Sequence, residues 1–330
     1  MTRQTKLTAL LFSVILLALP LFADTELVKL DNTEFSPWLS IARGEDVTQL
    51  LWLSEPGGGV LDGPFQGPMA FVTDRNGNLW AGDTLNARIT AFTPKGRPIK
   101  VIDLIKKAKQ AGLASDPVLA DLVPGIPGKL LVADVANNAI LEIDLRNAPP
   151  RAFRSSASGS GSWLQINQLH SDQQGNIFIE DVASRRTIIL NRDGKPFSQI
   201  LDGLLGIAVS RSSRVAVLAA DEKLPGIWQI LTAEKPGKKL QSLAFLRDDE
   251  PIIWAGLQGY DALNRLHAIY DTTSSRFYVS IAEDGTIVRK LQTAHTDPGY
   301  DLTRPDWLDA NGNLYSVTIS SDHLKVLTLK

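Results

Sequence analysis

The sequence predicts an all-β protein, a six-bladed β-propeller in which an N-terminal strand closes the last blade. Three observations support this prediction: a turn motif that recurs along the chain, a second set of aspartates in phase with it, and a composition rich in turn residues, with 25 Gly and 18 Pro in 330 residues. The 44% of hydrophobic residues excludes a disordered chain. The formal net charge of −2 offers no basic excess for nucleic acid, which we therefore exclude as a partner.

The first 23 residues have the pattern of a secretory signal peptide. Arg3 and Lys6 precede an apolar run over 9–19, Pro20 ends the run, and Ala23 is the small residue in front of a polar segment. We expect cleavage near Ala23 and a secreted or periplasmic mature chain; the alternative is an uncleaved N-terminal anchor. No later stretch is long and apolar enough to span a membrane, and a chain without cysteine cannot be a lipoprotein or a disulfide scaffold.

One turn motif recurs along the remainder of the chain, which we treat as a single domain over 24–330. Its clearest copies begin at Asp74, Asp172 and Asp309 and read Asp-x-x-Gly-Asn followed by an apolar and an aromatic residue. The aspartate of such a turn bonds to the turn backbone, the glycine supplies a positive φ, and the alternating residues that follow form a strand. Weaker copies lie at 125–131, 211–217 and 261–267. The six copies, about 47 residues apart, predict six units.

A second set of aspartates marks another turn in five of the six units, with nearly the same spacing: Asp83, Asp134, Asp181, Asp221 and Asp271. A third turn follows, as at 95–96, 193–194 and 284–285. Each unit then consists of four short antiparallel strands, which is the blade of a propeller. We interpret the regularly spaced aspartates as caps of the second turn rather than as metal ligands.

The last unit offers only three strands after residue 304, so its fourth strand must come from elsewhere. We expect the segment 47–53 to supply it and to close the ring without an open sheet edge. A seventh blade would need a hidden unit within 24–60, which the closing strand partly uses. Between the first two blades, apolar residues with helical spacing over 102–111, extended by 116–122, predict a helical insertion over about 101–122.

Residues 71–89 resemble an NHL repeat. The family's pattern has an Asp-x-x-Gly turn, found here at Asp74, an aspartate that ends the second strand, here Asp83, and Asn-x-Arg-Ile at the start of the third, here 86–89. The later units are similar mainly in their period. The resemblance implies a six-bladed propeller but no single activity, because the wider group includes protein- and RNA-binding modules, metal-dependent lactonases and lyases, and strictosidine-synthase-like enzymes.

The channel mouth at which the innermost strands begin is a common ligand site of propellers, and we expect those strands to begin near 66, 165, 258 and 304. The candidate ligand-binding residues there are Gln66, Asn167, Gln258, Tyr260, Arg304 and Asp306. The gluconolactonase-type relatives hold a divalent cation at this place with a Glu, an Asn and an Asp, so the resemblance assigns a metal, if one binds, to Asn167 and Asp306. Gln66 stands where the ligand glutamate would be, and glutamine lacks the charge that calcium prefers. We therefore expect no cofactor, or at most weakly bound calcium.

Local motifs of catalysis are missing from the sequence. It has no Gly-x-Ser-x-Gly elbow and no His-Glu-x-x-His, and its four histidines are far apart, with His170 and His267 expected as packed strand residues. The amides among the candidate residues can equally cap backbone groups near the axis. We favour a binding module without catalysis for a protein, peptide or glycan partner in the cell envelope. The alternatives are a metal-dependent lactonase or hydrolase of the gluconolactonase or strictosidine-synthase-like type, with its site at the channel mouth, and a passive scaffold in an envelope complex.

Overall fold

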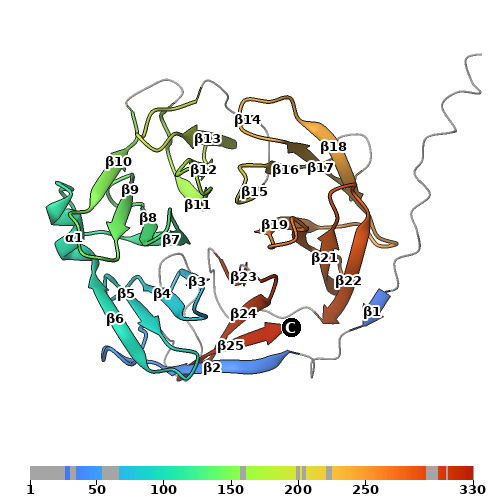
Figure 1. The fold of residues 1–330 in the computed structure, drawn as a ribbon. Coiled ribbons are helices and arrows are strands. Elements are labelled where there is room, and N and C mark those ends of the chain that lie inside the picture. The colour runs from blue at the N-terminus through green and yellow to red at the C-terminus, as the bar shows by residue number, and fades with distance from the viewer. Residues whose placement is uncertain are drawn as a thin grey trace, which may run out of the picture.

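The strands form six small sheets arranged in a ring, which is a six-bladed β-propeller (Figure 1). The computed structural model describes residues 27–29, 35–53, 67–156, 161–197, 201–202, 206–220, 225–294, 304–309 and 311–329. Within each blade the strands follow one another outward, so the first strand lies beside the central channel and the fourth at the rim. The predicted fold class is confirmed.

The first three blades take their strands from consecutive segments of the chain. Blade 1 contains β3 (Ala70–Thr73), β4 (Leu79–Asp83), β5 (Arg88–Phe92) and β6 (Pro98–Asp103). Blade 2 contains β7 (Leu119–Pro124), β8 (Lys129–Asp134), β9 (Ala139–Asp144) and β10 (Arg151–Arg154). Blade 3 contains β11 (Ile166–Ser171), β12 (Ile177–Asp181), β13 (Arg186–Leu190) and β14 (Leu201–Asp202).

Blades 4 and 5 continue in the same way, and blade 6 joins the two ends of the chain. Blade 4 contains β15 (Ile207–Val209), β16 (Val215–Ala220), β17 (Trp228–Ala233) and β18 (Gln241–Leu246). Blade 5 contains β19 (Trp254–Tyr260), β20 (Leu266–Asp271), β21 (Ser275–Ile281) and β22 (Ile287–Ala294), with β1 (Leu27–Lys29) added in parallel at its rim. Blade 6 contains β23 (Asp306–Leu308), β24 (Leu314–Ile319), β25 (His323–Leu329) and β2 (Ser36–Ala42).

The recurring turn joins the first and second strands of a blade. In blade 1, the Asp74 carboxylate accepts hydrogen bonds from the backbone N–H of Asn76 (2.8 Å) and of Asn78 (3.0 Å), and Gly77 has a φ of +74°. The equivalent aspartates accept the same pair of backbone hydrogen bonds in blades 3, 5 and 6: Asp172, Asp261 and Asp309. The motif therefore marks this turn because its polar side chain satisfies the backbone donors locally.

The second set of aspartates caps the turn after the second strand, as expected. Asp83 is fully buried and accepts hydrogen bonds from the side chains of Asn86 (2.8 Å) and Arg88 (2.9 Å). It also accepts one from the backbone N–H of Leu51, which precedes the blade. Asp134 and Asp181 bind the segments that enter blades 2 and 3 in the same way. These three aspartates thus tie their blades to the segments that lead into them. Asp271 binds Arg276 in the next strand of its blade, and Asp221 lies outside the described residues.

The strand that closes the ring is β2, and the prediction of 47–53 for this role is wrong. β2 pairs antiparallel with β25, with Leu39 opposite Val326 and Ile41 opposite Leu324. The segment 47–53 forms no strand; its apolar residues Leu50 and Trp52 are fully buried and hold a loop against the ring. Each segment buries two apolar residues, Leu39 and Ile41 in β2 and Leu50 and Trp52 in 47–53, so local composition does not tell them apart.

The helical insertion is shorter than predicted. Helix α1 (Leu104–Gln110) begins after Asp103, whose carboxylate accepts a hydrogen bond from the Lys106 N–H (2.9 Å), and it packs Leu104 and Ala108 against blade 1 and blade 2 residues. The extension over 116–122 is wrong, because residues 119–124 form β7, the innermost strand of blade 2. A short apolar run does not distinguish a buried strand from a buried helix.

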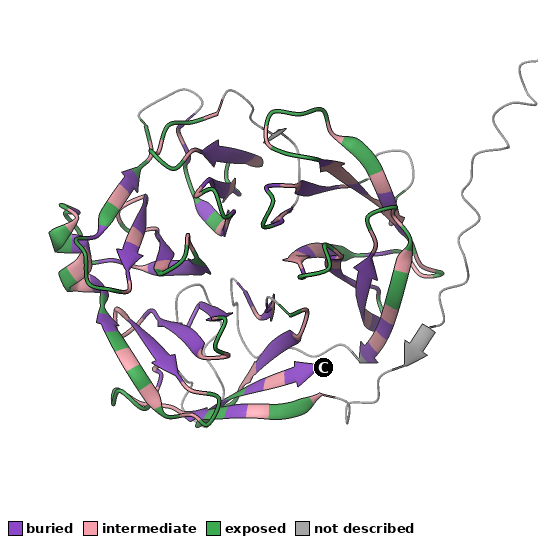
Figure 2. Ribbon diagram, in the orientation of Figure 1, coloured by how far each residue is buried: buried purple, intermediate pink, exposed green. Residues whose placement is uncertain are grey.

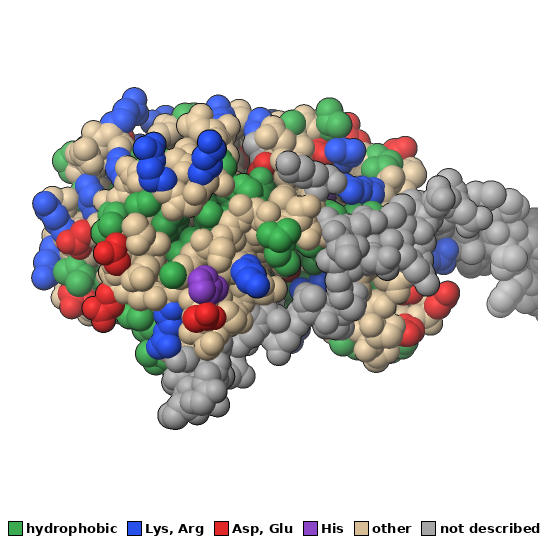
Figure 3. Space-filling view, turned by 90° about the horizontal axis from the view of Figure 1, so that it is seen from below, with side chains coloured by type: hydrophobic (Ala, Val, Ile, Leu, Met, Phe, Trp, Pro, Cys, Tyr) green, Lys and Arg blue, Asp and Glu red, His purple; other side chains and the backbone are tan. Residues whose placement is uncertain are grey.

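The core is divided among the blades rather than gathered at one centre. Figure 2 shows the inner and middle strands mostly buried, while the rim strands carry stripes of exposed residues. On the edge seen in Figure 3, basic and acidic side chains both occur between small groups of hydrophobic ones. Within the described residues no helix is long and apolar enough to cross a membrane.

Candidate functional site

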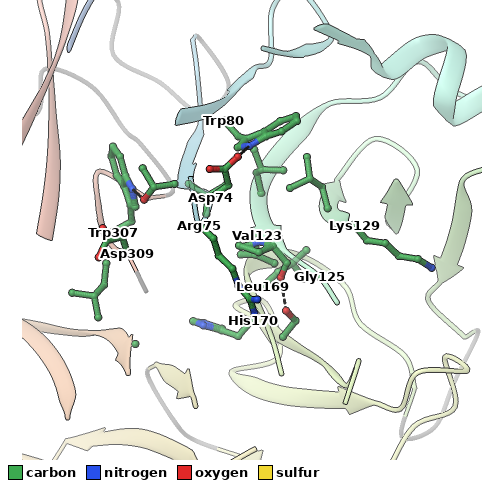
Figure 4. A pocket seen from close by; sticks show the side chains of 18 of the residues that line it. Asp74, Arg75, Trp80, Val123, Gly125, Lys129, Leu169, His170, Trp307 and Asp309 are labelled. Atoms are coloured by element: carbon green, nitrogen blue, oxygen red, sulfur yellow. Dashed lines mark hydrogen bonds between the residues drawn. The ribbon is translucent and has the colours of Figure 1, made fainter. Parts of the chain in front are cut away.

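A cavity of about 500 Å³ opens at the channel mouth where the innermost strands end (Figure 4). Its rim is formed by the recurring turns, since each of them follows the first strand of its blade. The side chains on which the site depends are Arg75, Trp80, His170, Arg211, Tyr260 and Trp307. This mouth is opposite to the one at which the innermost strands begin.

Arg304, which precedes β23 of blade 6, binds Asp121 in β7 of blade 2, two steps further along the ring. Its Nε and Nη2 donate to the two carboxylate oxygens of Asp121 over 3.1 and 2.8 Å. Nη2 also donates to the backbone oxygen of Leu169 (2.9 Å), whose own N–H donates to Asp121 (2.7 Å). Burial alone would lower the pKa of Arg304, but the charge and hydrogen bonds of Asp121 raise it above its ordinary value. This ion pair joins blades 6, 2 and 3 beneath the cavity.

His170 and Glu180 form a second connection beside this pair. The Nε2 atom of His170 lies 3.3 Å from Oε1 of Glu180, and both residues belong to blade 3. The same Glu180 oxygen accepts a hydrogen bond from the backbone N–H of Ile207 in blade 4 (2.8 Å). Figure 4 shows the His170 ring among the side chains that line the cavity. The prediction of His170 as a packed, hydrogen-bonded residue is confirmed.

Aromatic residues form much of the wall. Trp80 donates from Nε1 to Asp74 (3.1 Å), and Trp307 donates from Nε1 to Oγ1 of Thr73 (3.0 Å), so each indole is held in one orientation. The Tyr260 hydroxyl is buried and has no hydrogen-bond partner among the residues that the structure describes. Burial raises the pKa of Tyr260, so its hydroxyl stays protonated.

The lysine and arginine side chains of the lining fall into two classes, those with an ion-pair partner and those without one. Arg304 is paired with Asp121, and Lys129 with Glu142 (2.6 Å); Figure 4 shows Lys129 pointing away from the other labelled side chains. Arg75 and Arg211 are exposed and have no ion-pair or hydrogen-bond partner within the described part of the chain. These two guanidinium groups are therefore free to bind a ligand.

The structure places the predicted site residues at different levels of the channel. Gln258, Tyr260 and Arg304 line the cavity, whereas Asn167, exposed at the start of β11, and Asp306, buried at the start of β23, are not part of its lining. Gln66 lies outside the described residues. The expectation that an innermost strand begins at Gln258 is wrong, because β19 begins at Trp254 and ends at Tyr260.

The residues proposed for a metal do not form a good calcium site. The Asp306 carboxylate lies 3.4 Å from Nη1 of Arg276, and that arginine also binds Asp271 through two further donors. Among the described residues, no group of three or more His, Cys, Asp or Glu side chains is arranged to hold a metal. A hard cation prefers several carboxylate oxygens, whereas here one carboxylate already has a cationic partner.

Sequence reasoning missed Asp121, Arg75 and Arg211. Nothing in the local pattern of β7 marks Asp121, since its partner is 183 positions away in the chain. The two arginines did carry a signal: each occupies the second position of the recurring turn, after Asp74 in blade 1 and after Ser210 in blade 4. Aligning the six turns position by position would have shown them as the two charged residues at this place.

No family model matches the chain, and no curated protein is similar to it in sequence. Among solved structures, U3-55K has a TM-score of 0.52 and 9% identity, over 82% of this chain and 84% of that one. A gluconolactonase from Xanthomonas campestris has a TM-score of 0.49 and 14% identity, over 79% and 85%. A streptogramin B lyase has a TM-score of 0.49 and 13% identity, over 83% and 97%. At these identities the similarity concerns the fold alone.

Fold and site together define a class of protein. The chain is a six-bladed propeller with a ligand-sized cavity at one channel mouth.

Proposed function

We propose that this protein is an exported, NHL-like propeller that binds a ligand in the mouth cavity without catalysing a reaction. The ligand belongs to a partner in the cell envelope, a peptide, a glycan or a segment of a protein, or is a small molecule of that compartment. The observation that carries the proposal is the cavity itself. Its volume of about 500 Å³ lies in the range of ligand sites, and its aromatic walls offer apolar contact.

The state of the polar groups beneath the cavity favours binding over catalysis. A general acid or base needs a titratable group that is free to exchange a proton with the substrate. Asp121 is bound to Arg304 and to the Leu169 N–H, and Glu180 is bound to His170 and to the Ile207 N–H. These groups hold the blades together and leave the rim residues to make contact with a ligand.

A ligand screen with a cavity-filling variant tests the proposal. Amino acids, short peptides, sugars and organic acids are screened by thermal shift against the wild type and Val209→Trp, in which a partly exposed lining residue is enlarged. The matched control is Val101→Trp, a strand valine that is 42% exposed and lies away from the cavity. A ligand at one hundred times its Kd should stabilise the fold by about 2.7 kcal/mol, a shift of several degrees in Tm.

We expect at least one class of compound to raise the Tm of the wild type and of Val101→Trp but not that of Val209→Trp. The proposal fails if no class raises the Tm, or if every active compound stabilises Val209→Trp equally. Should Val209→Trp fold poorly, Ile126→Trp, which enlarges another lining residue, takes its place.

The alternative of a metal-dependent lactonase or hydrolase is tested by metal analysis. Calcium and zinc are measured in purified protein, and the Tm is compared with and without a chelator. We expect no stoichiometric metal and no change in Tm, because Asp306 is paired with Arg276. A stoichiometric metal whose removal lowers the Tm would contradict a function without catalysis. Export is tested by the mass of the mature chain, which should begin after Ala23.

A further inference from the structure

Arg75 and Arg211 occupy equivalent positions in two blades. Asp74 and Ser210 begin their turns in the same way: the N–H of Asp74 donates to the Asn78 oxygen (2.9 Å), and the N–H of Ser210 to the Arg214 oxygen (2.8 Å). The fourth turn residue has a positive φ in both, +74° at Gly77 and +69° at Ser213. The second residue of each turn, the arginine, therefore leaves the backbone at the same point of the repeat.

These two blades face each other across the ring. Blade 1 and blade 4 are three steps apart in a ring of six, and Figure 1 shows β3 and β15 on opposite sides of the channel. Both arginines line the same cavity. The equivalent positions in blades 2, 3 and 5 carry Ile126, Gln173 and Ala262, which have no charge. The rim thus presents two opposed positive groups with neutral residues between them.

The acidic residues of the lining do not neutralise these arginines by direct contact. Asp74, Asp172 and Asp309 each accept at least three hydrogen bonds within their own turns. Figure 4 shows Asp74 directed toward Trp80, while the Arg75 side chain extends toward Leu169 and His170. Both guanidinium groups keep all their donors for a ligand within the described structure.

We propose that the cavity binds a small organic dianion, with one acidic group on Arg75, the other on Arg211, and an apolar body between them against Trp307 and Tyr260. A guanidinium group binds a carboxylate or a phosphate through two parallel hydrogen bonds, which makes arginine the side chain suited to this role. The inference rests on the proposed binding function and names its ligand class.

The test is a titration with diacids of graded length. Dicarboxylates of four to ten carbons, the monocarboxylates of the same lengths, and pyrophosphate are titrated into the full-length protein. Binding is followed by calorimetry and by the fluorescence of Trp80 and Trp307, both of which line the cavity. We expect one chain length to bind best, the matching monocarboxylate to bind about tenfold more weakly, and affinity to fall as salt is added. Comparing pyrophosphate with the dicarboxylates identifies the acidic group that the site prefers.

Variants of the two arginines distinguish direct binding of the dianion by Arg75 and Arg211 from general electrostatic attraction. Arg75→Ala and Arg211→Ala should each weaken the best ligand about tenfold, and the double variant should abolish binding. Lysine at either position should retain part of the affinity, since it keeps the charge but not the forked geometry. The control is Arg97→Ala, an exposed turn arginine outside the cavity, which should bind as the wild type does. Because Arg75 and Arg211 are exposed and unpaired, the variants should keep the wild-type Tm.

Three outcomes would overturn the inference or its basis. If no dianion binds, or if binding is equal in the double alanine variant, the dianion inference is wrong. If a neutral compound binds, is lost in Val209→Trp and is unaffected by the arginine variants, the proposed function stands and only the ligand class is wrong. If no compound of either screen enters the cavity, both proposals fail together.

Discussion

Arg304 and Asp121 come from blades 6 and 2, which are two steps apart in the ring, and meet with almost no exposure to solvent, 8% and 0%. Removing two charges from water costs several kcal/mol, and only good geometry with further hydrogen bonds repays that cost. Here two nitrogens of Arg304 donate to the two oxygens of Asp121. In addition, the backbone oxygen of Leu169 accepts a hydrogen bond from Arg304, and the Leu169 N–H donates one to Asp121. The pair therefore fixes the relative positions of three blades.

Replacing one member of this pair should be strongly destabilising. In Arg304→Met the Asp121 carboxylate stays buried without its partner, so we expect the free energy of unfolding to fall by about 3–5 kcal/mol. Denaturant unfolding measures this loss. The double variant Arg304→Met/Asp121→Leu should recover much of it, and the exposed control Arg75→Met should change stability by less than about 0.5 kcal/mol. A single variant as stable as the wild type would show that the pair adds nothing to the fold.

His267 occupies the place that Trp80, Phe178 and Tyr315 take in other blades, and the expectation of a satisfied strand residue is confirmed. Its Nε2 lies 3.1 Å from Asp261 and its Nδ1 lies 3.1 Å from the Ser280 hydroxyl. A neutral ring that donates from Nε2 and accepts at Nδ1 satisfies both contacts. Burial lowers the pKa of His267 and outweighs the opposing effect of Asp261.

This lowered pKa makes stability depend on pH. In the unfolded chain a histidine titrates near pH 6.5, so below that value the unfolded state takes up a proton that the folded state resists. The contribution of His267 to stability is therefore complete above about pH 6.5 and is lost as the pH falls. His267→Tyr should remove this dependence on pH and keep a hydrogen bond to Asp261. In blade 6, Tyr315 makes the equivalent bond to Asp309 (3.3 Å).

Unfolding curves for both proteins between pH 7.5 and 5.5 check the prediction. The wild type should lose more stability than His267→Tyr over this range, in which the other groups titrate equally in both proteins. Parallel loss in the two proteins would mean that His267 does not carry the effect.

Among the elements, β2 is the one on which closure of the ring depends. It covers the outer edge of β25 along the whole strand, from Ser36 opposite Thr328 to Ala42 opposite His323. The hairpins within a blade form between neighbouring residues, but this pairing joins segments almost 300 residues apart and so gains its energy only when the ring is complete. A chain without cysteine has no disulfide to assist this closure.

Two truncations separate β2 from the residues before it. A chain that begins at Phe35 keeps β2 and should unfold in one sharp transition, with a modest loss from the removal of β1. A chain that begins at Arg43 exposes the edge of β25, and we expect a Tm lower by many degrees, a broader transition and aggregation through the open edge. Thermal unfolding and light scattering measure both effects. If the shorter chain unfolds as sharply as the longer one, β2 does not close the ring.

At the scale of the whole molecule, the two mouths of the channel differ in how well the local sequence pattern predicts the residues that form them. The mouth with the cavity is built from the recurring turns, and each of these is defined by about five consecutive residues, such as 74–78 and 172–176. The candidate residues chosen from strand starts concern the other mouth, with two exceptions. The length of β19 places Gln258 and Tyr260 at the cavity, and Arg304 also lines it. An error of a few residues in one strand boundary thus moves a residue from one face of the molecule to the other.

The sequence by itself determined the number of blades, the turn chemistry and the capping aspartates, because each depends on hydrogen bonds between residues within a few positions of one another. It also determined that the first part of the insertion is helical, through the spacing of apolar residues before Ala111. Only the tertiary structure decided which segment closes the ring, that 119–124 is a strand, and that Arg304 and Asp121 meet beneath a cavity flanked by Arg75 and Arg211. The closing strand and the ion pair depend on residues brought together around a ring, and a pairing between distant segments leaves no periodic signal in either of them. The run 119–124 is short and apolar, and such a run fits a buried strand and a buried helix equally well.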